Sequence, residues 1–301
     1  MAAIKRIAFA GIGNMGWPMA ANLVKAGFEV TACDAVPGRA EAFAAETGAK
    51  AASSPAEAVA GAECVVVIVP TSKQVAEAVA AMAPSLAKGM LVIDMTSGQP
   101  GRTREIAAGL AEKGVAMLDC PVSGGVPRAK TGQLAIMAGG AEADLDRAEP
   151  VLKAMGTSIH RCGPIGAGQA MKALNNLVSA GGYLIGIEAL LIGQRFGLDP
   201  AKMVDVLNAS TGMNNSTQKK FKEYVLSRRF DAGFGLDLMV KDLSIALEVG
   251  RETTTPTPFA ALCREMWASA AAMLGPGADH TAVAKLSEQM TGTVLGGNVE
   301  K

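Results

Sequence analysis

Short apolar runs and amphipathic helical patterns alternate along the first half of the chain. The run Cys64–Val69, CVVVIV, is apolar throughout and mostly β-branched, which is typical of a central parallel strand covered on both faces. We expect further strands at Arg6–Ala10, Glu29–Cys33, Met90–Met95, Ala116–Asp119, Leu134–Ala138 and Ser158–Arg161. Helical patterns fill the intervals, at about Trp17–Ala26, Arg39–Thr47, Pro55–Ala60, Lys73–Ala80 and Thr103–Glu112. This alternation predicts a doubly wound α/β domain over residues 1–164.

The second half of the chain shows only helical patterns. The first helix, about Gly168–Phe196, is apolar around most of its circumference, so we expect it to be buried on all sides, in part by a partner subunit. Helix starts are indicated at Asp199-Pro200 and at Asp279, and Gly197 and Gly250 are typical of helix stops. These patterns predict an all-helical domain over residues 165–301, joined to the first by the long helix.

Composition favours an enzyme with two sizeable cores. The chain has 301 residues, of which 50% are apolar, and 28 basic residues balance 28 acidic ones. No basic tract suggests nucleic acid, and aromatic residues are too few for base stacking. The segment Leu177–Ile192 contains Glu188 and several glycines, which makes it a poor membrane span and a good core helix.

Cysteine and histidine usage bears on compartment and metals. The five cysteines are scattered, which favours reduced thiols in a cytoplasmic location, and we interpret Cys120 as a small buried hydrophobe. The apolar stretch at the N-terminus is too short for a signal peptide. His160 and His280 have no partners at metal-ligand spacing, so we expect no metal site.

The segment that follows the first predicted strand is a dinucleotide-binding fingerprint. It reads GIGNMG, that is Gly11, Ile12, Gly13, Asn14, Met15 and Gly16, and lies between a strand and a helix. The first glycine makes the turn, the second admits a pyrophosphate, and the third packs the helix on the strand. The helix N-terminus adds free N–H groups and a positive dipole end.

Asp34 ends the second predicted strand, near the spacing expected for a ribose-binding acid. Its carboxylate would accept hydrogen bonds from the ribose and repel a 2′-phosphate. Since Ala35 rather than an arginine follows, the sequence predicts NAD over NADP. Asp34 is also compatible with a plain turn residue, because Pro37 and Gly38 lie just downstream.

A single lysine occupies the otherwise apolar start of the long helix. Lys172 is followed by Asn175 and Asn176, and positions i, i+3 and i+4 share a helix face. A lysine there is costly unless the site needs a proton-transfer group whose pKa burial can lower. The alternative is a lysine that extends along the helix start to solvent.

Two further groups of residues are placed to meet ligands. Ser123, Gly124 and Gly125 follow a predicted strand and would expose a hydroxyl and successive N–H groups, an anion nest suited to a carboxylate; a mobile loop is the alternative. Val69, Pro70, Thr71 and Thr96 end two predicted strands and should line the cofactor crevice, although each is also compatible with ordinary turn chemistry.

Four motifs together resemble the β-hydroxyacid dehydrogenase family, the relatives of 3-hydroxyisobutyrate dehydrogenase and tartronate semialdehyde reductase. These are GIGNMG, DCPVSGG from Asp119, GAGQAMKALNN at Gly166–Asn176 and MVKDL at Met239–Leu243, and they occur in the family's order. The resemblance implies a Rossmann-type domain and a helical domain joined by a long helix.

The resemblance also implies roles for individual residues. Lys172 matches the catalytic lysine, Asn176 the substrate-holding asparagine with Asn175 beside it, and Ser123–Gly125 the substrate carboxylate loop. Val69, Pro70, Gln74 and Thr96 match cofactor contacts, and Lys241, with Asp242 as its neighbour, matches a lysine that reaches the cofactor and the substrate. From the residues alone, Lys241 and Asp242 are an ordinary solvated pair.

The expected activity is NAD-dependent hydride transfer to or from a short 3-hydroxy acid, with Lys172 as general acid and base. Substrates of the 3-hydroxyisobutyrate, L-serine, glycerate or tartronate semialdehyde, glyoxylate and threonate types remain open. The polar segment Thr211–Thr217 and the segment Phe230–Leu238 are candidates for reading the substrate's side chain. The resemblance implies a homodimer or homotetramer.

Three other activities can be weighed against this one. Imine reductases share the fold but replace the lysine, which Lys172 argues against. A 6-phosphogluconate dehydrogenase has a larger helical domain and a histidine where Asn175 stands. A non-catalytic NAD-sensing module would have no need of Lys172, Asn176 and the nest together.

Overall fold

The computed structural model describes residues 4–296, which form two compact units that divide between Lys172 and Ala173. The division falls inside one continuous helix, α8 (Ala167–Phe196). Each unit has its own apolar core.

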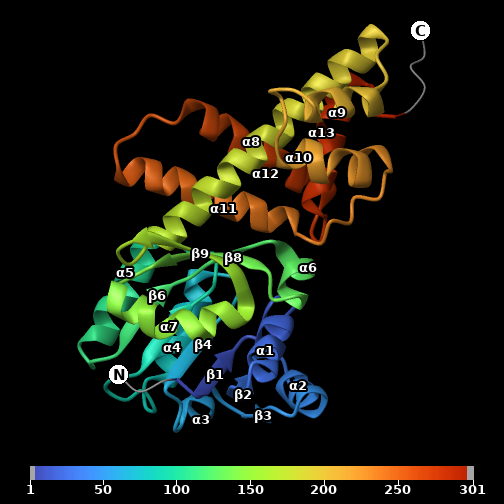
Figure 1. Ribbon diagram of the computed structural model, residues 1–301. Coiled ribbons are helices and arrows are strands. Elements are labelled where there is room, and N and C mark those ends of the chain that lie inside the picture. The colour runs from blue at the N-terminus through green and yellow to red at the C-terminus, as the bar shows by residue number, and fades with distance from the viewer. Residues whose placement is uncertain (1–3, 297–301) are drawn as a thin grey trace. The chain divides into compact units, whose positions relative to one another are not determined.

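The N-terminal unit is built on a mixed sheet whose strands are joined mostly by helices (Figure 1). Its strands are β1 (Arg6–Ala10), β2 (Glu29–Cys33), β3 (Lys50–Ala51), β4 (Cys64–Val67), β5 (Leu91–Asp94), β6 (Ala116–Asp119), β7 (Val122–Ser123), β8 (Leu134–Gly139) and β9 (Gly156–Gly163). Its helices are α1 (Gly16–Lys25), α2 (Arg39–Thr47), α3 (Pro55–Val59), α4 (Ser72–Met82), α5 (Pro100–Ala111), α6 (Gly125–Lys130) and α7 (Glu142–Met155).

The strand order of this sheet defines where a ligand can bind. The order is β3-β2-β1-β4-β5-β6-β8-β7, with β9 paired to β8. Strands β3 to β6 are parallel, whereas β8 runs antiparallel to β6 and β7. The order reverses between β1 and β4, and ligands of doubly wound sheets bind outside the carboxyl ends at such a point.

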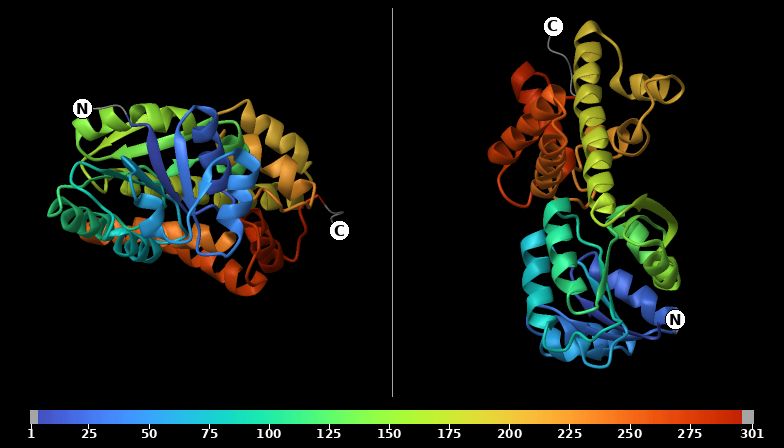
Figure 2. Two further views of the ribbon diagram at one scale, coloured as in Figure 1. Left: turned by 90° about the horizontal axis from the view of Figure 1, so that it is seen from below. Right: turned by 90° about the vertical axis from the view of Figure 1, so that its left-hand side faces the viewer.

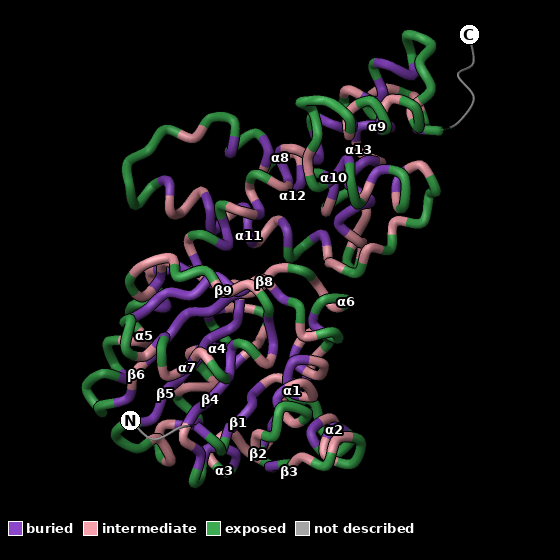
Figure 3. The backbone as a smooth tube through the Cα atoms, in the orientation of Figure 1, coloured by how far each residue is buried: buried purple, intermediate pink, exposed green. Residues whose placement is uncertain are grey.

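Alternate residues of each central strand enter two separate cores. Ile7 and Phe9 of β1 pack toward α1, α2, α6 and α7, whereas Ala8 and Ala10 pack toward α3, α4 and α5. Strands β4 and β5 are buried along their whole length (Figure 3). Burial on both faces explains why the run at β4 is apolar at every position.

The second unit consists of helices around α8 (Figure 2). They are α9 (Pro200–Asn208), α10 (Asn215–Lys219), the π-helix η1 (Phe221–Leu226), α11 (Leu236–Glu252), α12 (Pro258–Leu274), the 3₁₀-helix η2 (His280–Val283) and α13 (Ala284–Thr291). Glycines of α8 allow close packing in this unit. A Cβ on Gly186 would lie 2.5 Å from the Phe221 ring, and one on Gly193 would lie 2.3 Å from the side chain of Met203.

Sequence patterns predicted most of these elements, with some differences. The doubly wound domain, the helical second domain and the long joining helix are confirmed. The sequence analysis did not predict β3, β7, α6, α7, α10 or η1. Among residues 165–296, one isolated bridge between Gly235 and Asp279 is the only β-pairing.

One prediction about the helical half is wrong, and another stays a prediction. Gly250 does not end a helix, because α11 continues to Glu252; its missing side chain instead lets the helix approach Thr257, 3.0 Å from where a Cβ would stand. Helix α8 exposes Val178, Ile185, Ile192 and Phe196 within one chain, so its burial on all sides, in part by a partner subunit, stays a prediction. Each of these four side chains is more than half exposed.

Candidate functional site

The glycine turn between β1 and α1 has the shape that a pyrophosphate needs. Gly11 has φ +99°, and a Cβ there would lie 2.0 Å from the carbonyl oxygen of Ile68. A Cβ on Gly16 would lie 1.8 Å from the carbonyl oxygen of Gly11. A Cβ on Gly13 would meet no atom within 4 Å. Two glycines are therefore required by packing, and Gly13 borders open space.

The N-terminus of α1 is available to an anion. No side chain caps it, and its first turn contains no acidic residue. Of the other fingerprint residues, Ile12 is buried, Met15 is partly buried and Asn14 is exposed. The uncapped N–H groups and the space beside Gly13 fit the diphosphate of a dinucleotide.

Asp34 is held by the turn it ends. Its carboxylate accepts hydrogen bonds from the backbone N–H groups of Ile12 at 2.7 Å and Val36 at 2.8 Å. The Arg39 guanidinium donates to the same carboxylate at 3.1 Å. The turn interpretation of Asp34 is therefore correct, and its ribose-binding role stays a prediction. The contact with Arg39 was not predicted, because Arg39 lies five residues after Asp34 and not directly after it.

The ends of β4 and β5 are tied to each other. The hydroxyl of Thr96, which is 1% exposed, accepts a hydrogen bond from the N–H of Val69 at 3.1 Å. Pro70 and Gln74 lie exposed beyond β4, and the Thr71 hydroxyl, which caps α4, donates to Gln74 at 3.0 Å. Thr96 thus fixes the local backbone, while Val69, Pro70 and Gln74 lie beyond the carboxyl end of β4, and their role as cofactor contacts stays a prediction.

The Ser123–Gly125 segment is a strand-to-helix junction and not an unstructured loop. Ser123 pairs with Ala135 of β8, and α6 begins at Gly125. Gly124 and Gly125 have φ values of +129° and +65°. A Cβ on Gly124 would lie 2.6 Å from the Arg128 side chain, so the glycine is required there. Successive backbone N–H groups at a turn of this kind can form an anion nest, and positive φ favours glycine at both positions.

Lys172 is buried at the start of α8. Its exposed fraction is 8%, so the interpretation of a side chain extended to solvent is wrong. Asn175 and Asn176 follow on the same helix, and the Asn175 amide donates to the Asn176 oxygen at 3.0 Å. The helix therefore presents an amine and two amides at the spacing the sequence predicts.

The helical unit contains a buried amide–carboxylate pair that includes Asn176. Its side-chain nitrogen donates to the Asp242 carboxylate at 2.6 Å, and Asp242 is 1% exposed. Lys241 lies 3.4 Å from the same carboxylate, with 24% of its side chain exposed. The expectation of a solvated pair at Lys241 and Asp242 is wrong, because α11 packs the Asp242 side chain against α8.

The two segments proposed to read the substrate are largely engaged in local structure. In Thr211–Thr217, the Asn214 side chain accepts hydrogen bonds from the N–H groups of Ser216 and Thr217. Asn214 and Thr217 form a capping box at the start of α10. Within Phe230–Leu238, the N–H groups of Gly233 and Phe234 donate to Asp279. Their roles as substrate-reading segments stay predictions.

Sequence analysis missed two buried polar residues near Lys172. Asp119 is 0% exposed at the end of β6, and Gln169 is 1% exposed in the first turn of α8. Both carry visible signals: Asp119 is an acid that ends an apolar strand, and Gln169 is an amide at the start of an apolar helix. Their roles were not predicted, because their hydrogen-bond partners lie far away along the chain.

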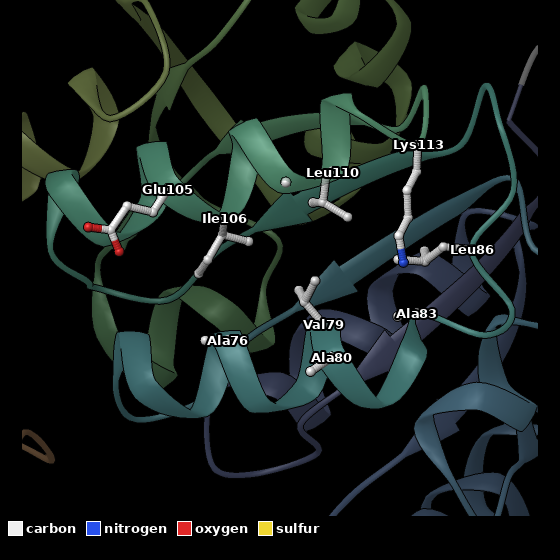
Figure 4. Close-up of a pocket in the computed structure, with 10 residues that line it drawn as sticks. Ala76, Val79, Ala80, Ala83, Leu86, Glu105, Ile106, Leu110 and Lys113 are labelled. Atoms are coloured by element: carbon white, nitrogen blue, oxygen red, sulfur yellow. The ribbon is translucent and has the colours of Figure 1, made fainter.

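Other features of the molecule lie apart from these residues. An apolar groove of about 230 Å³ runs between α4 and α5, with Glu105 and Lys113 among its lining residues (Figure 4). Within residues 4–296, no group of three or more His, Cys, Asp or Glu side chains could hold a metal ion. Helix α8 is long and apolar enough to cross a membrane, a property that core helices of globular proteins share.

Comparison with known proteins agrees with this geometry. Residues 6–163 match the family model described as the NAD binding domain of 6-phosphogluconate dehydrogenase. Residues 166–287 match the model described as NAD-binding of NADP-dependent 3-hydroxyisobutyrate dehydrogenase. The two matches together span nearly all of the chain.

Individual relatives match over nearly their full length. The chain is 35% identical to 2-(hydroxymethyl)glutarate dehydrogenase of Eubacterium barkeri, over 97% of this chain and 98% of the relative. It is 36% identical to NAD-dependent L-serine dehydrogenase of Pseudomonas aeruginosa, over 88% and 91%. A structure of Mycobacterium tuberculosis 3-hydroxyisobutyrate dehydrogenase with L-serine superposes with a TM-score of 0.87 at 35% identity, over 94% and 98%. The chain belongs to the β-hydroxyacid dehydrogenase family and is an NAD-dependent oxidoreductase that acts on CH–OH groups.

Proposed function

We propose that the protein oxidises the primary alcohol of a 2-substituted 3-hydroxypropionate to the aldehyde and catalyses the reverse reduction. The relatives support this substrate class, because 3-hydroxyisobutyrate, L-serine and 2-(hydroxymethyl)glutarate all contain HOCH₂–CH(X)–COO⁻. They differ only in X, which is methyl, ammonium or carboxyethyl. A glycerate-type substrate, with X a hydroxyl, belongs to the same class.

The burial of Lys172 carries the proposal. Lys172 is 8% exposed and shares a helix face with two amides, a shielded arrangement that suits a proton-transfer group. In the proposed reaction the neutral amine takes the proton of the substrate hydroxyl, and in the reverse direction the ammonium returns a proton to the oxygen. Proton transfer of this kind typically contributes about 10²–10⁴-fold.

The other residues of the N-terminal unit hold the reactants. The Ser123–Gly125 nest would bind the substrate carboxylate through backbone N–H groups. The glycine turn and the N-terminus of α1 would hold the cofactor's diphosphate, with the nicotinamide toward the ends of β4 and β5. NAD, when bound, supplies the acceptor for the hydride that leaves the carbinol carbon. Lys241 and Asn176 match, by resemblance, residues that contact the substrate.

Turnover of a substrate panel tests this proposal. NADH formation would be followed with 3-hydroxyisobutyrate, L-serine, 2-(hydroxymethyl)glutarate and glycerate, against threonate and glycolate, which lack the HOCH₂–CH(X)–COO⁻ unit. We expect kcat/KM for at least one of the first four to exceed both others by about tenfold or more. Preference for threonate or glycolate would contradict the substrate class. NAD binding without turnover of any acid would instead favour a sensing module.

We also propose that a second copy of the chain covers the exposed stripe on α8. Val178, Ile185 and Ile192 are spaced by seven residues, a spacing that suits packing against another helix. Glu188 and Arg195, also exposed, give the stripe one charge of each sign, so two copies would not repel each other. Isolated apolar residues are common on surfaces, but a continuous stripe marks an interface.

The mass of the particle in solution tests the proposed interface. We expect the wild type to be a homodimer or homotetramer and Ile185→Lys to lower its mass at micromolar concentration. Val206→Lys is the matched control, because Val206 is equally apolar, 64% exposed and on α9. A monomeric wild type, or an equal effect of both substitutions, would contradict the interface.

We place the protein in a reducing, cytoplasmic compartment. All five cysteines are free thiols, and Cys33, Cys64, Cys120 and Cys263 are buried in the two cores. Buried reduced thiols pack as small apolar side chains, so folding needs no oxidant. Fractionation of cells that produce the protein would test this placement.

A further inference from the structure

Gln169 joins the first turn of α8 to the segment that follows β5. Its side-chain nitrogen donates to the carbonyl oxygen of Thr96 at 2.8 Å and to the Asp94 carboxylate at 3.3 Å. Its side-chain oxygen accepts from the N–H of Gly98 at 2.7 Å. The amide thus spans the segment 96–98 with both of its ends.

The backbone of the same turn is held by a second strand end. The Asp119 carboxylate accepts from the N–H of Gly166 and from the N–H of Gln169, each at 2.7 Å. Burial raises the pKa of the Asp119 carboxyl to about 6, although these backbone hydrogen bonds act in the opposite direction. Asp119 and Asp94 are register partners on β6 and β5, so the turn is fixed against two neighbouring strands.

Little space is left for this turn to move. A Cβ on Gly168 would lie 2.3 Å from the carbonyl oxygen of Met137 and 2.5 Å from that of Asp119. A Cβ on Gly98 would lie 2.5 Å from the Ser72 hydroxyl. Gly168 thus packs the first turn of α8 against β6 and β8, and Gly98 packs the 96–98 segment against α4, with the Gln169 amide 3.5 Å from where its Cβ would stand.

These contacts of Gln169, which we call the clamp, link the carboxyl ends of the strands to the helical turn that precedes Lys172. Thr96, which Gln169 contacts, also accepts the hydrogen bond from Val69 at the end of β4. Lys172 follows Gln169 by three residues, so it lies on the same helix face about 4.5 Å further along the axis. A shift of this turn would move the origin of the lysine side chain relative to the strand ends.

We propose that Gln169 is a positioning residue that fixes Lys172 at the cofactor edge by clamping the 96–98 segment to the first turn of α8. This inference rests on the proposed role of Lys172 in proton transfer. Misplacement of a reacting group by about 1 Å can cost about 10²-fold in rate, so a small rearrangement would be visible in turnover.

The chain contains a matched control for this clamp. Gln194 lies on the same helix, is 3% exposed, donates to the carbonyl oxygen of Val294 at 2.8 Å and accepts from the N–H of Gly296 at 3.0 Å. It therefore has similar burial to Gln169 and likewise donates to one backbone carbonyl and accepts from one backbone N–H, but it stands 22 residues from Lys172. A purely structural role predicts similar consequences for loss of either amide.

The test compares Gln169→Met with Gln194→Met, two substitutions that keep side-chain length and remove the hydrogen bonds. We expect both to lower the melting temperature. Only Gln169→Met should lower kcat, by about 10²-fold, with KM and the Kd for NAD changed by less than about threefold. In the NAD-free protein, acylation of Lys172, followed by mass spectrometry, should be faster in Gln169→Met and unchanged in Gln194→Met.

Several outcomes would overturn the inference. One is a wild-type kcat in Gln169→Met, and another is an equal loss of kcat in both variants. If Gln169→Met does not fold, Gln169→Glu, which keeps the length and the acceptor for Gly98, should show the same selective loss of kcat. Lys172→Ala is measured in parallel. If this variant retains turnover, the proposed function fails. If it loses turnover while Gln169→Met stays fully active, only the clamp is overturned.

Discussion

The two units of this protein bury polar side chains in different ways. In the N-terminal unit the buried acids Asp94 and Asp119 end neighbouring strands and accept hydrogen bonds from backbone N–H groups. In the helical unit some buried polar groups pair with other side chains, as Asn176 does with Asp242 and Glu288 with Arg228, and Gln194 binds backbone groups that lie beyond the last helix.

The difference follows from how each architecture uses its backbone. A parallel sheet ends all its strands along one edge, where helices and loops begin and their N–H groups need acceptors. Helices satisfy their own interior backbone, so a polar side chain buried between them needs a side-chain partner or a backbone group outside the helices. A binding site therefore arises at the sheet edge from topology, whereas in the helical unit it must be built pair by pair.

Substitution of two glycines in the fingerprint should produce the largest changes in stability and in NAD affinity. Gly16→Ala places a Cβ 1.8 Å from the carbonyl oxygen of Gly11, and we expect it to reduce the free energy of unfolding by about 3 kcal/mol. Gly13→Ala meets no protein atom, so stability should be unchanged while NAD affinity falls at least about tenfold. Denaturant titration and NAD titration measure both. Unchanged NAD affinity in Gly13→Ala would remove the diphosphate assignment.

Substitution of Asp34 should have an intermediate effect and reveal what Arg39 does. Asp34→Ala removes the acceptor expected to bind the ribose and releases the Arg39 guanidinium, now 3.1 Å from the carboxylate. We expect NAD to bind about tenfold more weakly and the preference to shift toward NADP, whose 2′-phosphate an arginine can bind. The double variant with Arg39→Ala should lose the gain for NADP. An unchanged cofactor preference in Asp34→Ala would contradict the ribose role.

A fall in pH should change the stability of the two units in opposite directions. We expect this to be the smallest of the three effects. The folded-state pKa of Asp119 is raised to about 6, so its contribution is present at low pH and is lost as pH rises through 6. Burial lowers the pKa of His280, which lies against Asp279 and near Lys220, so its contribution is present above about 6.5 and is lost as pH falls.

Hydrogen exchange resolves the two units in one sample. Between pH 7 and pH 5, protection around β6 should rise by on the order of 1 kcal/mol, and protection around η2 should fall. Asp119→Asn should flatten the first change and His280→Gln the second. A change of the same sign in both units would show that these two groups do not control the pH response.

Sequence patterns predicted the N-terminal unit well because its signals are local. The β-branched run at β4 and the glycines that fix the turn after β1 determine strands and turn through neighbours a few residues away. The same locality placed Lys172, Asn175 and Asn176 on one helix face. Asp199 and Asp279 were found as helix starts for the same reason, since each caps the helix that follows it.

What sequence did not predict depends on partners far along the chain. Asp242 reads as half of a solvated pair until Asn176, 66 residues earlier, is seen to donate to it. Gln169 has no evident role until Gly98, 71 residues earlier, lies against it. Gly250 resembles a helix stop in the sequence. Only the fold shows that α11 continues past it and that Thr257 packs against it. Such contacts are tertiary and leave no periodic signal.

Amine rescue of Lys172→Ala tests the central claim most directly. With the best acid from the substrate panel, we predict that the variant binds NAD normally, loses about 10²–10⁴-fold in kcat and regains part of it when methylamine or ethylamine is added. A variant that turns over at the wild-type rate, or that loses NAD binding together with turnover, would contradict a proton-transfer role for this lysine.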